Sequence, residues 1–184
     1  AAAERDEDLL YICYDNEIYG NTGGQRSSAT PLGAVTTTTP QGKPLGKKDI
    51  LSIVAAHRVP YAASISLAHP EDALRKMRTG LAVRGFAFLH ILSPCPTGWK
   101  SEPADGVELI RLAVRTGLFP VVEIRSGGPP KIDIEPDFSD EDLASYFALQ
   151  GRFGKSRVDL DTVRASIRET WERLERLAPQ GDQS

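Results

Sequence analysis

The sequence predicts an α/β domain in which a parallel sheet is flanked by helices. Short apolar runs of the length of buried strands alternate with segments whose apolar residues recur at helical spacing. Polar residues rich in glycine or proline, which favour turns, separate these runs. A chain of 184 residues is long enough for one such domain. Strands that alternate with helices in this way usually pair in parallel through right-handed crossovers.

The composition is that of an ordinary soluble globular protein, with 40% hydrophobic and 26% charged residues. A formal net charge of −3 gives no reason to expect a nucleic acid or an anionic membrane as a partner. The sequence has no apolar run of about 18 residues, and its acidic start is not typical of a signal peptide. Two cysteines do not form a disulfide framework, which favours a reducing, cytoplasmic location.

The first expected strand covers residues 9–14 and ends at Asp15. Residues 26–46 are rich in Ser, Thr, Pro and Gly, and we expect an ordered loop that contacts a cofactor or a partner subunit. The remaining segments predict helices at 47–58, 69–80, 105–116, 139–150 and 158–177, and strands at 61–66, 85–92 and 119–124.

The breaker cluster at 126–130 divides the chain into a domain at 1–126 and a mostly helical extension at 127–184 that docks onto another subunit. Residues 180–184 are expected to be disordered. Helical spacing predicts which apolar side chains face inward: Leu74, Met77 and Leu81 in the second helix, and Val163, Ile167, Trp171 and Leu174 in the last.

A polar, glycine-rich segment from Asn16 to Gly24 directly follows the first strand. Ligand sites of parallel α/β sheets lie beyond the carboxyl ends of the strands. Glycines let backbone amides approach an anion closely, and side-chain amides can bind a hard cation through oxygen. These features indicate a diphosphate–metal site. A surface turn is the alternative, because Asn and Gly also favour turns.

The segment DNEIYGNTGGQ, residues 15–25, resembles the second half of the thiamine diphosphate motif of pyruvate:ferredoxin oxidoreductases. AVTTTTP at 34–40 resembles the segment that follows it in their β subunits. Further blocks fit the same subunit in the same order: AAHRVPY at 55–61, SPCPTGW at 93–99 and QGRF at 150–153. The chain therefore resembles the carboxyl-terminal part of such a β subunit, which implies a thiamine diphosphate-binding fold that is incomplete at its N-terminus.

This resemblance implies roles for five residues of the loop. Asn16 would bind Mg²⁺ through its side chain, and Ile18 would bind it through its backbone carbonyl. Asn21 would lie beside the reactive end of the cofactor as a catalytic hydrogen-bond donor. Gly20 and Thr22 would contact the cofactor. The structural alternatives are an Asx turn for Asn16 and a left-handed turn for Asn21.

Cys95 lies between two prolines after an apolar strand. An isolated cysteine is usually a small buried hydrophobe. Within SPCPTGW, however, the resemblance implies that Cys95 is one thiolate ligand of a [4Fe–4S] cluster near the thiamine, whose other ligands are missing from this chain. Cys13 is expected to be a core residue of the first strand, and His90 a hydrogen-bonded core histidine.

The resemblance implies oxidative decarboxylation of pyruvate to acetyl-CoA and CO₂, with electrons passed to ferredoxin, in a complex with the α and other subunits. Another 2-oxoacid is an alternative, since the pyruvate enzymes often carry a bulkier residue at the position of Gly20. A truncated, non-catalytic interaction subunit is a second alternative. The Gly-Asp-Gly that opens the family's motif does not precede Asn16, so we expect the isolated chain to be inactive.

Overall fold

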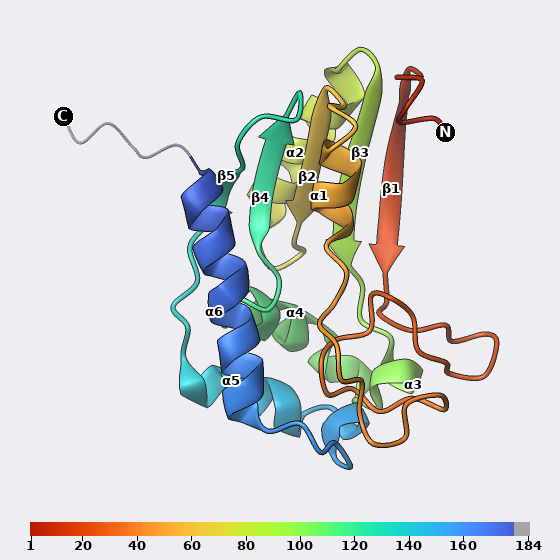
Figure 1. The fold of residues 1–184 in the computed structure, drawn as a ribbon, viewed down its shortest axis with the longest axis vertical. Coiled ribbons are helices and arrows are strands. Elements are labelled where there is room, and N and C mark those ends of the chain that lie inside the picture. Colours follow the sequence, from red (N-terminus) through yellow and green to blue (C-terminus); the bar gives the residue numbers. More distant parts are fainter. Residues whose placement is uncertain (179–184) are drawn as a thin grey trace.

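The computed structural model describes residues 1–178 and contains a five-stranded mixed sheet with the strand order β1-β3-β2-β4-β5 (Figure 1). β1 and β2 both pair in parallel with β3, which lies between them, whereas β4 is antiparallel to β2 and β5 is antiparallel to β4. The expectation for residues 180–184 lies outside the described part. The strands are β1 (Leu9–Asp15), β2 (Tyr61–Ile65), β3 (Phe86–Leu92), β4 (Val121–Arg125) and β5 (Lys131–Ile134).

Capping side chains set where several helices begin. Asp49 caps the first helix by accepting a hydrogen bond from the amide of Ser52, so this helix starts three residues later than the sequence predicts. Ser139 and Asp159 cap the last two long helices in the same way. The helices are α1 (Ile50–Ala55), α2 (Pro70–Ala82), α3 (Pro96–Trp99), α4 (Gly106–Arg115), α5 (Asp140–Ala148) and α6 (Leu160–Leu177), with short 3₁₀ turns η1 (Pro103–Asp105) and η2 (Gly151–Phe153).

The expected α/β class is confirmed, but the sheet is not parallel throughout. α3 and α4 lie beyond the carboxyl end of β3 instead of returning along a face of the sheet (Figure 1). The chain therefore enters β4 from that same end, and β4 runs antiparallel to its neighbour β2. β5, which the sequence did not predict, follows the breaker cluster and pairs with β4 through Val122 and Ile132.

The face that α2 presents to the sheet differs in part from the predicted one: Met77 packs against the core as predicted, but the two leucines do not. Leu74 and Leu81 are 52% and 74% exposed, whereas Lys76 is fully buried. The Lys76 ammonium donates to the carbonyl of Ser64 at 3.0 Å and forms ion pairs with Asp72 at 2.9 Å and Asp133 at 2.8 Å. These partners compensate the ammonium for the loss of water. A charged side chain can therefore be buried at a position that the apolar pattern did not predict to face inward.

The predicted inward face of α6, in contrast, is confirmed. Val163, Ile167, Trp171 and Leu174 are all buried, and they form one stripe along the helix. The indole nitrogen of Trp171 donates to the carbonyl of Gly117 at 2.9 Å, which ties α6 to the turn after α4.

Gly117→Ala is expected to destabilise this contact. Gly117 has φ of +78°, and a Cβ there would lie 2.6 Å from Trp171 Nε1. The left-handed conformation alone should lower the free energy of unfolding by about 1–2 kcal/mol, and the clash should add to this. Urea unfolding of the chain measures the loss. Gly106→Ala, at the other end of α4, is the control, because its Cβ would meet nothing closer than 3.8 Å. Equal stability of the two variants would contradict the expectation.

The segment between β1 and α1 is an ordered loop, as expected. Lys43 is buried, and its ammonium donates to the carbonyls of Ser28, Thr30 and Gly46 at 3.0, 2.5 and 3.0 Å. The amide of Thr37 donates to the carbonyl of Gly24 at 3.0 Å, so the threonine-rich stretch lies against the glycine-rich loop. Its predicted contact with a cofactor or another subunit stays a prediction.

Candidate functional site

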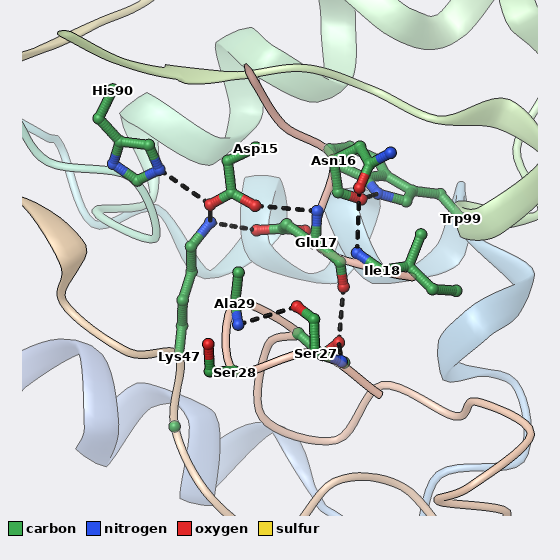
Figure 2. A network of polar contacts seen from close by, with 12 residues as sticks. Asp15, Asn16, Glu17, Ile18, Ser27, Ser28, Ala29, Lys47, His90 and Trp99 are labelled. Atoms are coloured by element: carbon green, nitrogen blue, oxygen red, sulfur yellow. Dashed lines mark hydrogen bonds and ion pairs between the residues drawn. The ribbon is translucent and has the colours of Figure 1, made fainter. Parts of the chain in front are cut away.

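The loop after β1 and the segment after β3 lie side by side, because these two strands are neighbours that end together. Asp15 pairs with Leu92 at the last position of the parallel register. The indole nitrogen of Trp99 then donates to the carbonyl of Asn16 at 2.9 Å (Figure 2). The structure thus brings together two of the sequence blocks that are far apart along the chain.

Cys95 is in close contact with the loop through Gly98. A Cβ at Gly98 would lie 2.7 Å from Ile18 Cγ2 and 3.2 Å from Cys95 Sγ, so only glycine fits between the two side chains. The Cys95 sulfur accepts a hydrogen bond from the Gly98 amide at 3.4 Å and caps α3. Within residues 1–178, no group of three or more His, Cys, Asp or Glu side chains could hold a metal ion.

Four of the five predicted loop residues are exposed, and Ile18 is half-buried. Oδ1 of Asn16, an exposed residue, accepts a hydrogen bond from the amide of Ile18 at 3.3 Å, which is the expected Asx-turn geometry. An amide oxygen has a second lone pair, so this turn leaves Asn16 able to bind a cation. Within the described residues, the carbonyl of Ile18 and the side chain of Asn21 make no hydrogen bond. Nothing lies within 4 Å of a Cβ built at Gly20, and Thr22 Oγ1 donates to Gln25 at 2.7 Å.

Beneath these exposed residues lies a group of five charged or titratable side chains, here called the buried charge cluster. Lys47 Nζ is 2.5 Å from Asp15 Oδ2 and 2.9 Å from Glu17 Oε1, and His90 Nε2 is 2.8 Å from Asp15 Oδ2 (Figure 2). The fifth member is Arg152, whose Nη2 is 2.7 Å from Glu17 Oε2. Asp15, Glu17, His90 and Arg152 are buried, and the side chain of Lys47 is 19% exposed.

The ion pairs keep Asp15 and Lys47 charged in spite of their burial. Burial alone would raise the pKa of Asp15, but the hydrogen bond with His90 and the Lys47 ammonium hold it well below its usual value. Burial alone would lower the pKa of Lys47, but the carboxylates of Glu17 and Asp15 raise it. The site therefore contains two carboxylates and two cations that neutralise each other at neutral pH.

Asp15→Asn is expected to lower the free energy of unfolding at neutral pH and to make that free energy less dependent on pH in the acid range. Because the folded pKa of Asp15 lies below the unfolded value, its contribution is fully present above about pH 4 and is lost as the pH falls towards the folded pKa. Removing the charge should cost roughly 1–3 kcal/mol at pH 7, with a smaller difference at low pH.

Urea unfolding of both proteins between about pH 2 and pH 7 measures this change. Asp8→Asn is the control, because Asp8 is 57% exposed and pairs with the exposed Arg84. If the free energies of unfolding of wild type and Asp15→Asn differed by the same amount over this whole pH range, the lowered pKa of Asp15 would be contradicted.

The sequence did not predict this cluster as a unit. His90 was expected to be a hydrogen-bonded core residue, which is confirmed, and Arg152 belonged to a block with no assigned role. Lys47 was placed in a helix, whereas it precedes α1 and reaches back to Asp15. One signal was available: Asp15 and Glu17 are two carboxylates at the end of an apolar strand, and they need cationic partners if they are buried.

A cavity of about 190 Å³ adjoins the cluster on the side of α6. Glu17, Lys47 and His90 contribute to its wall, together with apolar residues of β3, β4 and α6. None of the loop residues predicted to bind the cofactor lines it: Asn16, Ile18, Gly20, Asn21 and Thr22. The candidate site is therefore the exposed loop and not this cavity.

Comparisons with known proteins show which family this chain resembles. Residues 1–91 match the family model described as the thiamine pyrophosphate enzyme, C-terminal TPP binding domain. Ketoisovalerate oxidoreductase subunit VorB of Pyrococcus furiosus is 43% identical over 182 residues, which cover 95% of this chain and 58% of the relative. Pyruvate synthase subunit PorB of Methanocaldococcus jannaschii is 49% identical over 131 residues, 68% of this chain and 44% of the relative.

Among solved structures, the chain resembles a 2-oxoglutarate:ferredoxin oxidoreductase from Magnetococcus marinus, with a TM-score of 0.54 and 24% identity over 99% of this chain and 57% of that one. This likeness shows the fold. The chain spans 58% of the length of the ketoisovalerate oxidoreductase subunits. None of the helices within residues 1–178 has the length and apolar character needed to cross a membrane.

Proposed function

Because the chain belongs to the family of 2-oxoacid:ferredoxin oxidoreductase β subunits, we propose that it forms part of the thiamine diphosphate site of such an enzyme. The reaction is the oxidative decarboxylation of a 2-oxoacid, with coenzyme A as acyl acceptor and ferredoxin as electron acceptor. The partners are the α and other subunits, and the extension at 127–184, whose β5 completes the sheet of the domain at 1–126, docks onto one of them. The carrying observation is the loop at the end of β1, where Asn16 and Asn21 are exposed and Ile18 is half-buried, with a carbonyl that accepts no hydrogen bond within residues 1–178.

The loop fits a metal–diphosphate group in its donor chemistry. Asn16 Oδ1 and the carbonyl oxygen of Ile18 would bind Mg²⁺, which prefers oxygen ligands. Diphosphate oxygens would complete the coordination of the ion. The backbone at Gly20 and the side chain of Thr22 would lie along the cofactor. Thiamine diphosphate supplies the nucleophilic carbon that this decarboxylation needs.

Asn21 would act on the substrate. Its side-chain amide has no hydrogen-bond partner within the described residues, so it is free to donate to the substrate carboxylate or to the oxygen that gains charge during reaction. A turn whose backbone is already formed brings this donor to the substrate without refolding of the loop. The turn is closed by Thr22 and Gln25 and by the left-handed Gly23 and Gly24.

Cys95 would hold one iron of a [4Fe–4S] cluster. Its sulfur is separated from the Ile18 side chain only by Gly98, which supports a cluster placed directly beside the cofactor loop. Such a cluster takes four thiolates, and the chain has two cysteines, so further ligands would come from other segments.

Pyruvate is the proposed substrate, because the AVTTTTP and SPCPTGW blocks resemble the pyruvate enzymes. 2-Ketoisovalerate is the second candidate. The ketoisovalerate oxidoreductase subunits match at 43–44% identity over 182 residues, and the open space around Gly20 leaves room beside Asn21 for a branched side chain.

Kinetics of the assembled oxidoreductase, containing the full-length β subunit, test the proposal. Ferredoxin reduction is measured with pyruvate, 2-ketoisovalerate and 2-oxoglutarate in the presence of Mg²⁺, thiamine diphosphate and coenzyme A. We expect thiamine-dependent activity with the highest kcat/KM for pyruvate. A higher value for 2-ketoisovalerate would select the second candidate, and no thiamine-dependent activity with any 2-oxoacid would overturn the proposal.

A further inference from the structure

Glu17 stands between the two proposed metal-binding residues in a backbone conformation that non-glycine residues rarely adopt, with φ of +63°. Its amide and its carbonyl are both hydrogen-bonded. Its amide donates to Asp15 Oδ1 at 2.9 Å, and its carbonyl accepts from Thr30 Oγ1 at 2.6 Å. Its two carboxylate oxygens pair with Lys47 and Arg152. Because the conformation is unfavourable by itself, these contacts must maintain it.

Arg152 reaches Glu17 from η2, near the other end of the chain, and is itself fixed in place. Its Nε donates to Gln150 Oε1 at 2.8 Å, and its Nη2 donates to the Tyr146 hydroxyl at 3.2 Å. Its guanidinium lies 4.1 Å from the ring centroid of Trp99, the residue whose indole donates to the Asn16 carbonyl. Arg152 therefore supports the peptide at Asn16 and Glu17 both directly and through Trp99.

We propose that Arg152, acting through Glu17, is a positioning residue that sets the relative placement of Asn16 Oδ1 and the Ile18 carbonyl for Mg²⁺. This inference rests on the proposed function, and it gives the QGRF block a role in the same site. The left-handed residue between the two ligands determines how they are oriented relative to each other, and its carboxylate is what Arg152 holds.

Fold stability alone does not account for the arrangement. A buried ion pair can often be replaced by apolar residues with no loss of stability, because the cost of desolvation offsets the attraction. Groups that hold metal ligands from behind, in contrast, strongly affect metal affinity. Arg152 and Glu17 are 2% and 5% exposed, so burial removes both charged groups from water.

The test uses the assembled oxidoreductase with Arg152→Met, Glu17→Gln and the double variant. The Kd for Mg²⁺ is measured by titration calorimetry at saturating thiamine diphosphate, and kcat is measured at limiting and saturating Mg²⁺. We expect each single change to raise the Kd roughly 10- to 100-fold. The double variant should lose no more Mg²⁺ affinity than the weaker-binding of the two single variants, because both residues act through one ion pair. Saturating Mg²⁺ should restore most of kcat.

The matched controls are Arg75→Met and Glu123→Gln, which break an ion pair of 2.8 Å that joins α2 to β4. They should leave the Kd for Mg²⁺ unchanged. An equal rise of this Kd in the controls, or a Kd within about twofold of wild type in Arg152→Met and Glu17→Gln, would overturn the positioning role. If Arg152→Met fails to assemble, Glu17→Gln decides, because it keeps the shape of the side chain. A wild-type complex without Mg²⁺-dependent thiamine binding would instead overturn the proposed function.

Discussion

Cys95→Ser in the assembled oxidoreductase is expected to remove the proposed [4Fe–4S] cluster and to abolish ferredoxin reduction. A serine hydroxyl is a hard ligand that replaces a soft thiolate, so the iron becomes labile. The new side chain still fits at the start of α3, where Cys95 Sγ accepts a hydrogen bond from the Gly98 amide. Iron analysis and electron paramagnetic resonance measure the cluster, and carbon dioxide release measures any remaining decarboxylation.

Cys13→Ser is the matched control for this experiment. Burial and the neighbouring Asp15 carboxylate raise the pKa of the Cys13 thiol, which disfavours the thiolate that iron needs. The cluster should therefore persist in this variant, while stability falls by about 1–3 kcal/mol if the hydroxyl finds no partner. A full complement of iron in Cys95→Ser, or loss of the cluster only in Cys13→Ser, would contradict the assignment of Cys95.

The contact between Ile18 and the Cys95 region joins the two proposed sites through Gly98. The two loops lie at the ends of different strands, which by itself suggests independence of cofactor and cluster. β1 and β3 are neighbours, however, and Gly98 leaves no space between Ile18 Cγ2 and the sulfur. We therefore expect Cys95→Ser to retain thiamine binding, while a larger residue at Gly98 would disturb both sites together.

Periodicity along the chain was sufficient to predict the α/β class, the end of β1 at Asp15 and the buried stripe of α6, because each depends on local patterns. It was not sufficient for the direction of β4. Whether a helix returns along the sheet or stays beyond its end depends on packing between distant segments, which local pattern does not encode. The same holds for α2, where Lys76 is buried because Asp133 of β5 neutralises it.

The candidate site divides in the same way. The resemblance to a known motif identified the residues on the exposed surface of the loop, because that motif is contiguous in sequence. The buried charge cluster was missed because charged residues are usually at the surface, and a pattern within one segment does not reveal a partner elsewhere. Glu17 and Arg152 form their ion pair only after β1 and η2 have been brought together by the fold.

Asn21→Ala in the complete complex is expected to lower kcat by roughly 10²- to 10³-fold, the loss seen when a hydrogen-bond donor to a developing negative charge is removed. Within the described residues the Asn21 side chain makes no hydrogen bond, so its truncation leaves no buried partner unsatisfied. The structure of the turn and the affinity for thiamine diphosphate should therefore change little.

Steady-state rates and titration calorimetry with thiamine diphosphate separate these two effects. Thr22→Val serves as the comparison on the same turn, because it removes the 2.7 Å hydrogen bond from Thr22 Oγ1 to Gln25 that closes the turn. It should weaken cofactor binding more than it lowers kcat, which is the reverse of the pattern expected for Asn21→Ala. A variant Asn21→Ala that bound thiamine diphosphate more weakly but kept its kcat would show that Asn21 is only a binding or turn residue, because a donor to the transition state must act on the rate.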